Sequence, residues 1–189
     1  MKPTPDQLKA AQDTVIPDLL PAPGAPLLVL FCGINPGLYS GATGHHFARP
    51  GNRFWPALEL SGFTERRLDP SEQGLLPSYG LGITNLAART TAKADELTPE
   101  ELAEGGRRLV ALVEEYRPRW LAVAGVTAYR TAFGRRKAAI GPQDDTIGTT
   151  LVWVLPNPSG LNAGWNLERI AAEFARLRAS SLDDQLSGQ

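Results

Sequence analysis

The chain has 189 residues, of which 42% are hydrophobic and 21% are charged, and its formal net charge is −1. This length favours one domain around a single core, and no apolar run is long enough to cross a bilayer, so we expect a globular protein without a membrane partner. A net charge near zero provides no overall basic field, so any nucleic-acid site must be a local patch.

Residues 1–26 contain six prolines, each of which removes a backbone donor and fixes φ. We therefore predict a loosely attached Pro-rich arm, with room for a short helix over residues 6–13. Aspartates and prolines also stand where a signal peptide would need a basic start and an apolar stretch, so we expect a cytoplasmic protein. The single cysteine, Cys32, and two adjacent histidines are too few for a disulfide framework or a structural zinc site.

Four apolar runs have the length of a β-strand. They cover residues 27–32, 82–86, 120–124 and 151–155, and the second is the weakest. A continuous apolar run is typical of a strand that is covered on both faces, as in a parallel sheet.

Helical patterns separate these runs. In the clearest, Thr98 is the expected N-cap, Pro99 occupies the first turn and Pro118 ends the element, while Gly105-Gly106 is a weakness within it. A second amphipathic pattern covers residues 167–177.

Strands that alternate with helices predict an α/β fold, a single-domain three-layer α/β/α sandwich with a mostly parallel central sheet. We assign this domain to residues 27–178, after the arm of residues 1–26. The polar residues 179–189 are predicted to form a C-terminal tail.

Two unusual loops follow predicted strands. The first contains GINPG (33–37) and continues to FARPGNRFW (47–55), and the second reads PNPSGLN (156–162). Ligands of open α/β sheets bind in the loops that leave the carboxyl ends of the strands, so these two loops are the expected site if their strands are near neighbours.

Together, these segments resemble the mismatch-specific uracil/thymine-DNA glycosylases of the uracil-DNA glycosylase superfamily. The resemblance runs from about Leu28 to about Leu177 and includes the segments ITNLAART and GGRRL. One motif alone would be weak, but three in the right order at the ends of predicted strands are specific. The resemblance implies a uracil-DNA glycosylase-like fold.

It also implies a function in base excision repair. We expect a monofunctional, monomeric DNA glycosylase that flips uracil out of G·U mismatches in double-stranded DNA, hydrolyses its N-glycosidic bond and leaves an abasic site. Thymine from G·T mismatches and modified pyrimidines are further candidate substrates. Bond cleavage places positive charge on the sugar and negative charge on the base, so fixed dipoles and a positioned water suffice, and no metal or cofactor is predicted.

Two residues are candidates for catalysis. The resemblance implies that Asn35 positions the attacking water, which an amide can orient but cannot deprotonate at neutral pH; the alternative is a turn residue before proline. Asp95 stands where related bacterial members carry asparagine, and a carboxylate there could activate water and stabilise the cationic sugar. A solvated acid or helix cap is the alternative for Asp95.

Four residues are candidates for binding the base. Phe47 matches the aromatic residue that stacks on the extruded base, and backbone amides around Ile34 and Phe47 would recognise its edge. Ser40 stands where the family has a small polar residue, and Asn157 would lie near the base or the phosphates. The alternatives are a core phenylalanine, a turn serine and a loop asparagine that bonds to its own backbone.

The last predicted loop and two arginines are candidates for binding DNA. Leu161 matches the apolar wedge that fills the space left by the extruded nucleotide; the alternative is a leucine that caps the core. Arg49 and Arg53 flank the pocket loop and are the expected phosphate contacts, and His45 and His46 are weaker candidates. Around the wedge, the residues expected to contact DNA are Ser159, Gly160 and Asn162, whereas Ala163-Gly164 replaces an arginine that a relative uses to read guanine.

The main rival function is a non-catalytic protein that binds mismatched or damaged DNA with the same loops. Such a binder needs the wedge and the stacking ring but has no use for Asn35. A nucleotide-binding or hydrolytic enzyme is disfavoured, because the chain lacks G-x-x-x-x-G-K-[ST], G-x-G-x-x-G and G-x-S-x-G.

Overall fold

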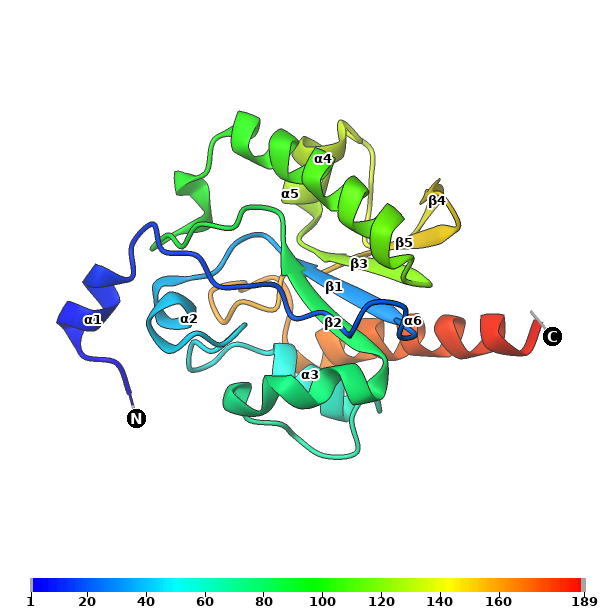
Figure 1. Ribbon diagram of the computed structural model, residues 1–189, viewed down its shortest axis with the longest axis horizontal. Helices are drawn as coiled ribbons and strands as arrows, with labels where there is room; N and C mark the ends of the chain where they lie inside the picture. The colour runs from blue at the N-terminus through cyan, green and yellow to red at the C-terminus, as the bar shows by residue number, and fades with distance from the viewer. Residues whose placement is uncertain (1, 188–189) are drawn as a thin grey trace.

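The computed structural model describes residues 2–187 and has a five-stranded sheet between two helical layers (Figure 1). The strands lie in the order β2-β1-β3-β5-β4. Four are parallel neighbours, and β4 is antiparallel to β5. The predicted α/β fold with a mostly parallel sheet is thus confirmed. The strands are β1 (Val29–Gly33), β2 (Leu81–Asn85), β3 (Trp120–Ala124), β4 (Gly141–Ile147) and β5 (Thr150–Leu155).

The four predicted strands are present, and β4 was not predicted. Every residue of β1, β2 and β3 is buried, as expected for strands covered on both faces. In contrast, β4 is largely exposed and begins with Gly141 and Pro142, so its sequence lacks an apolar strand pattern. This strand forms because its backbone pairs with β5 at the sheet edge.

Helices cover both faces of the sheet (Figure 1). Helices α4 and α5 pack on one face, around Leu30, Leu121 and Leu109. On the other face, α3 and α6 pack around Phe31 and Phe174. No helix in the described part of the chain is long and apolar enough to span a membrane. The helices are α1 (Pro5–Ala10), α2 (Leu38–Thr43), α3 (Phe54–Leu60), α4 (Pro99–Tyr116), α5 (Val126–Phe133) and α6 (Leu167–Ser187), with 3₁₀ turns η1 (Pro70–Tyr79) and η2 (Ala94–Glu96).

The N-terminal arm is packed on the domain, contrary to the expectation of loose attachment. Ala11 and Ile16 are buried, and Leu19 exchanges two backbone hydrogen bonds of 2.8 Å with Ile83 of β2. Because β2 is an edge strand, this pairing covers part of the open edge.

The predicted polar tail is also different in the structure. Helix α6 continues from Leu167 through Ser187, so most of residues 179–189 extend the helix, and residues 188–189 lie outside the described residues. Ser181 is buried within this extension.

Candidate active site

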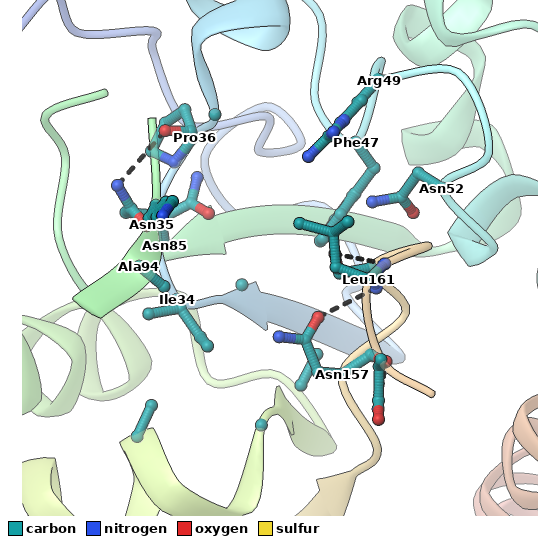
Figure 2. Close-up of a pocket in the computed structure, with 18 of the residues that line it drawn as sticks. Ile34, Asn35, Pro36, Phe47, Arg49, Asn52, Asn85, Ala94, Asn157 and Leu161 are labelled. Carbon is teal, nitrogen blue, oxygen red and sulfur yellow. Dashed lines mark hydrogen bonds between the residues drawn. The ribbon is translucent and has the colours of Figure 1, made fainter. Parts of the chain in front are cut away.

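A pocket of about 690 Å³ opens at the carboxyl ends of the parallel strands (Figure 2). Strand β1 lies between β2 and β3. After β1, the chain adds β2 on one side of it and then β3 on the other side, so the strand order changes direction next to β1. This position is the switch point at which open α/β sheets bind ligands. The predicted site residues that line the pocket are Ile34, Asn35, Ser40, Phe47, Arg49, Asp95, Asn157, Ser159, Leu161 and Asn162.

Asn35 is held in one orientation by three acceptors. The two protons of its amide nitrogen are shared among the carbonyls of Pro36 (3.2 Å) and Arg89 (3.0 Å) and the hydroxyl of Thr91 (2.7 Å). The Thr91 hydroxyl donates its own proton to the carbonyl of Lys93, so it must accept from Asn35.

These contacts leave the Asn35 amide oxygen for the pocket. Among the described residues, none donates a hydrogen bond to this oxygen. An amide oxygen in this state can accept a hydrogen bond from water and orient it. The three acceptors thus fix which end of the amide is free, so that Asn35 offers the pocket an acceptor oxygen and not a donor nitrogen.

Asp95 lies on the exposed turn η2 at the rim of the same pocket. Its neighbour Glu96 accepts the backbone N–H of Lys93 and so makes the capping contact of this turn. Asp95 has no hydrogen bond or ion pair within the described chain, and its carboxylate is available to a ligand in the pocket.

The ring of Phe47 forms part of the pocket wall. It stacks on Phe54, with 4.1 Å between ring centroids and 22° between ring planes. Phe47 has a positive φ of 51°, and a β-carbon at Gly33 would lie 3.2 Å from its Cζ. Because Gly33 has no side chain, the ring of Phe47 can lie close to it. In this position the ring can stack on a planar group.

His46, the neighbour of Phe47 in the sequence, lines the pocket, is buried and joins three segments. Its Nε2 donates to the carbonyl of Pro17 (2.9 Å), and its Nδ1 accepts from the amide nitrogen of Asn85 (3.4 Å). Burial lowers the pKa of His46 below its ordinary value, which favours the neutral ring that this pattern of one donor and one acceptor nitrogen requires. Its contacts are structural, and it holds the pocket loop in place.

Asn85 is a pocket residue that sequence reasoning missed. It is the last residue of β2, pairs with Gly33 in the sheet register and lines the pocket. A signal was present, because Asn85 belongs to the ITNLAART segment, immediately after a predicted strand. In Figure 2, Asn35 and Asn85 lie on one side of the pocket, and Asn157 and Leu161 on the other.

The side chains of Ser40 and Ile34 support the pocket walls. Ser40 is buried, and its Oγ accepts the backbone N–H of Ala48 at 3.2 Å. The Ile34 side chain packs over Gly125 at the start of α5, where an added β-carbon would lie 3.1 Å from Ile34 Cδ1. Both residues support the loops that carry Asn35 and Phe47.

The loop after β5 is compact, although its tip is exposed. Asn157 Oδ1 accepts the N–H of Ser159, and Asn162 donates to the carbonyl of Asn157, both at 2.9 Å. Leu161 is 69% exposed and lies at the pocket mouth. Gly160 allows a close approach, because a β-carbon there would lie 2.8 Å from the carbonyl oxygen of Gly51.

Arg49 and Arg53, both predicted to contact phosphate, are placed differently. Arg49 is exposed at the pocket mouth, whereas the guanidinium of Arg53 turns inward. It donates to the carbonyls of Ser159 and Trp165 and, at 2.9 Å, to that of Asn162. Arg53 therefore fixes the Leu161 loop, which corrects the expectation for this residue; neither Arg53 nor Gly160 lines the pocket.

Comparison with protein families assigns the chain to a superfamily. The model of the uracil DNA glycosylase superfamily matches residues 22–178, which include both loops of the pocket. Members of this superfamily are DNA glycosylases, hydrolases of base excision repair that act on uracil in DNA. The match covers most of the chain, and the chain therefore belongs to the uracil DNA glycosylase superfamily.

Proposed function

We propose that this protein hydrolyses the N-glycosidic bond of uracil mispaired with guanine in double-stranded DNA. The base flips into the pocket, and the product is an abasic site in an uncut strand. Thymine and modified pyrimidines opposite guanine are candidate further substrates.

One observation carries this proposal: an exposed leucine stands at the mouth of a pocket that contains an oriented amide. Leu161 is 69% exposed on a loop that Arg53 holds in place. A rigid apolar tip can enter a duplex and fill the space that a flipped nucleotide leaves. Flipping costs less at a mismatch than at a paired base, which supports a preference for G·U.

The pocket residues have distinct roles in the proposed reaction. The uracil ring stacks on Phe47, while the amide oxygen of Asn35 orients the attacking water. As the bond breaks, the sugar becomes positive, and the Asp95 carboxylate at the pocket rim stabilises that charge. Arg49 at the mouth contacts a phosphate of the flipped strand.

The test is single-turnover base release from duplexes that contain one uracil. We expect release from G·U to be faster than from A·U, and the product strand to remain uncut until it is treated with alkali. Equal rates for G·U and A·U would refute mismatch specificity. Tight binding of the G·U duplex without base release would identify the protein as a non-catalytic mismatch binder.

We expect Leu161→Ala to lower the rate of base release from G·U by about tenfold, because the flipped base returns to the stack when nothing fills its place. The measurement is single-turnover release, with 2-aminopurine fluorescence beside the uracil to report flipping. The matched control is Leu60→Ala on α3, because Leu60 is also highly exposed, at 60%, and does not line the pocket. Equal rates for both variants would contradict a wedge role.

We expect Asp95→Asn to lower the rate of release by about tenfold while duplex affinity stays unchanged, because an amide stabilises the cationic sugar less well than a carboxylate. The control is Glu100→Gln, which removes a negative charge from an exposed position on α4. If Asp95→Asn matches the wild-type rate, Asp95 is a solvated acid with no part in the reaction.

A further inference from the structure

Residues 11–19 lie outside the family match, which begins at residue 22, yet they contact two segments that line the pocket. Ile16 of this segment is itself 6% exposed and lines the pocket. We refer to residues 11–19 as the N-terminal clamp. Figure 1 shows that this part of the chain starts at the pocket end of the sheet and runs along β2, antiparallel to it.

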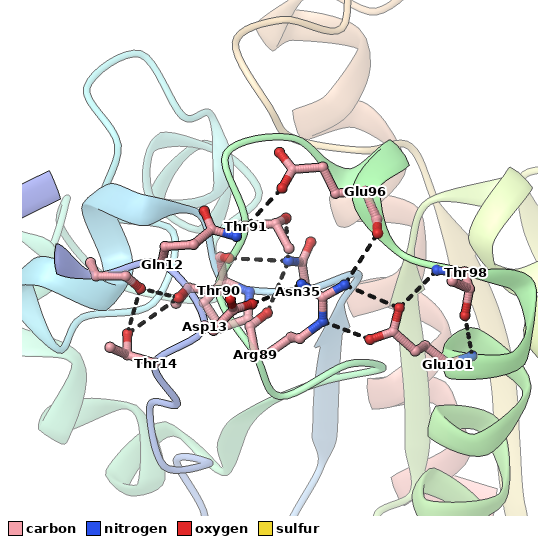
Figure 3. Close-up of polar contacts among 12 residues, drawn as sticks. Gln12, Asp13, Thr14, Asn35, Arg89, Thr90, Thr91, Glu96, Thr98 and Glu101 are labelled. Carbon is pink, nitrogen blue, oxygen red and sulfur yellow. Dashed lines mark hydrogen bonds and ion pairs between the residues drawn. The ribbon is translucent and has the colours of Figure 1, made fainter. Parts of the chain in front are cut away.

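The N-terminal clamp binds Thr90, the central residue of the segment Arg89–Thr91 (Figure 3). The N–H of Asp13 donates to the carbonyl of Thr90 (3.1 Å), and the N–H of Thr90 donates to the carbonyl of Thr14 (2.8 Å). Thr90 therefore makes both of its backbone hydrogen bonds with the clamp.

Side chains reinforce this pairing. The hydroxyls of Thr14 and Thr90 lie 3.2 Å apart, and each donates to the carbonyl of Ala11. Asp13 forms an ion pair of 2.9 Å with Arg89, whose guanidinium also binds Glu101 at 2.6 Å. The Glu101 carboxyl has its pKa lowered to about 2 by Arg89, so the group is ionised at neutral pH.

The two residues beside Thr90 orient Asn35. The carbonyl of Arg89 and the hydroxyl of Thr91 are two of the three acceptors of the Asn35 amide nitrogen. The clamp thus holds one side of a three-residue segment, and Asn35 binds the other side (Figure 3). Displacement of that segment would move the acceptors that fix the amide.

The packing leaves little space for such a displacement. A β-carbon at Gly41 of α2 would lie 2.6 Å from Thr90 Cγ2 and 2.9 Å from Thr14 Oγ1. The clamp, α2 and Arg89–Thr91 are therefore in close contact. The clamp also supplies the Pro17 carbonyl that accepts from His46, another residue that lines the pocket.

We propose that the N-terminal clamp is a positioning element that sets the orientation of the Asn35 amide through Arg89–Thr91. This inference rests on the proposed function, in which Asn35 orients the attacking water. It assigns the clamp a part in the reaction that is indirect, through the acceptors that hold the Asn35 amide.

The variant that tests it is Asp13→Asn/Thr14→Val in the full chain. Asparagine suits the positive φ of 59° at residue 13 and removes the charge that pairs with Arg89, and valine removes the Thr14 hydroxyl at nearly constant volume. The matched control is Asp6→Asn/Thr4→Val, which makes the same two changes in α1 of the same arm. Thr4 caps α1, and within the described residues its hydrogen bonds are made only with Gln7 and Leu8 of that helix.

We expect the clamp variant to release uracil from G·U about fivefold more slowly than wild type, with unchanged duplex affinity. The control should keep the wild-type rate. The single variant Thr14→Ser, which keeps the hydroxyl that valine removes, should keep it as well. In an Asn35→Ala background, the clamp changes should have no further effect, because both act on one step. A fivefold loss that persists without Asn35, or no loss at all, would overturn the proposal.

A second readout does not depend on activity. The side-chain amide signals of Asn35 in a ¹⁵N–¹H spectrum, identified by their loss in Asn35→Ala, should shift in the clamp variant and stay in place in the control. Unchanged signals in the clamp variant would refute positioning even if uracil release were slower. Shifted signals in a protein that releases no uracil would support positioning and refute the proposed function alone.

Discussion

Replacement of Asn35 by alanine is expected to lower the single-turnover rate of uracil release from a G·U duplex by about 10²–10³-fold. The physical reason is the fixed polarity of its amide. The nitrogen donates to Pro36, Arg89 and Thr91, so the oxygen is left to orient water. Without that oxygen, an attacking water has no fixed position, and the entropic advantage of a held nucleophile is lost.

Duplex affinity, measured by fluorescence anisotropy, should change little in Asn35→Ala, because the wedge and the stacking ring remain. Asn35→Asp is an informative companion variant. A carboxylate is a better base than an amide, but its second oxygen would face three acceptors that need a donor. We therefore expect Asn35→Asp to be impaired as well. Wild-type rates in Asn35→Ala would assign the handling of water to another group, with Asp95 as the first candidate.

The largest expected effect on stability is that of Gly105→Ala in α4. A β-carbon at Gly105 would lie 2.7 Å from the carbonyl carbon of Leu86, a backbone atom that cannot rotate away. Alanine favours a helix over glycine by about 1 kcal/mol, whereas overpacking costs about 3 kcal/mol. We expect a net loss of about 2 kcal/mol in the free energy of unfolding, measured by urea denaturation.

Gly74→Ala is the matched control for Gly105→Ala. A β-carbon at Gly74 would meet nothing within 4 Å, and this glycine has no positive φ. The free energy of unfolding should therefore stay close to the wild-type value. If Gly105→Ala is as stable as Gly74→Ala, α4 can shift away from Leu86 without loss of packing.

The role of Gly105-Gly106 cannot be predicted from helix propensity alone. In the sequence, this pair weakens a helix, because glycine has a poor helix propensity. In the structure, it lets α4 approach the backbones of Leu86 and Ala132, where a β-carbon at Gly106 would lie 2.6 Å from the Ala132 carbonyl oxygen. The gain from close packing depends on segments far along the chain and is invisible to local propensity.

Arg53 and the N-terminal arm illustrate the same limit. A basic residue beside a pocket loop predicts phosphate contact, but the three carbonyls that Arg53 binds lie more than 100 positions away in the sequence. Prolines in residues 1–26 predict a loose arm, but backbone pairing with Ile83 and Thr90 holds it against the domain. Such contacts exist only after the chain has folded.

The sequence by itself determined the α/β class, the four parallel strands and the two loops of the site. Buried parallel strands have continuous apolar sequences, which can be recognised without a structure. The Asn-Pro loops follow two such strands, and the carboxyl ends of parallel strands lie at the same edge of the sheet. Only the tertiary structure decided the strand β4, the inward turn of Arg53, the presence of Asn85 in the pocket and the orientation of Asn35. Each of these depends on hydrogen bonds or packing between segments distant in sequence, which no local pattern encodes.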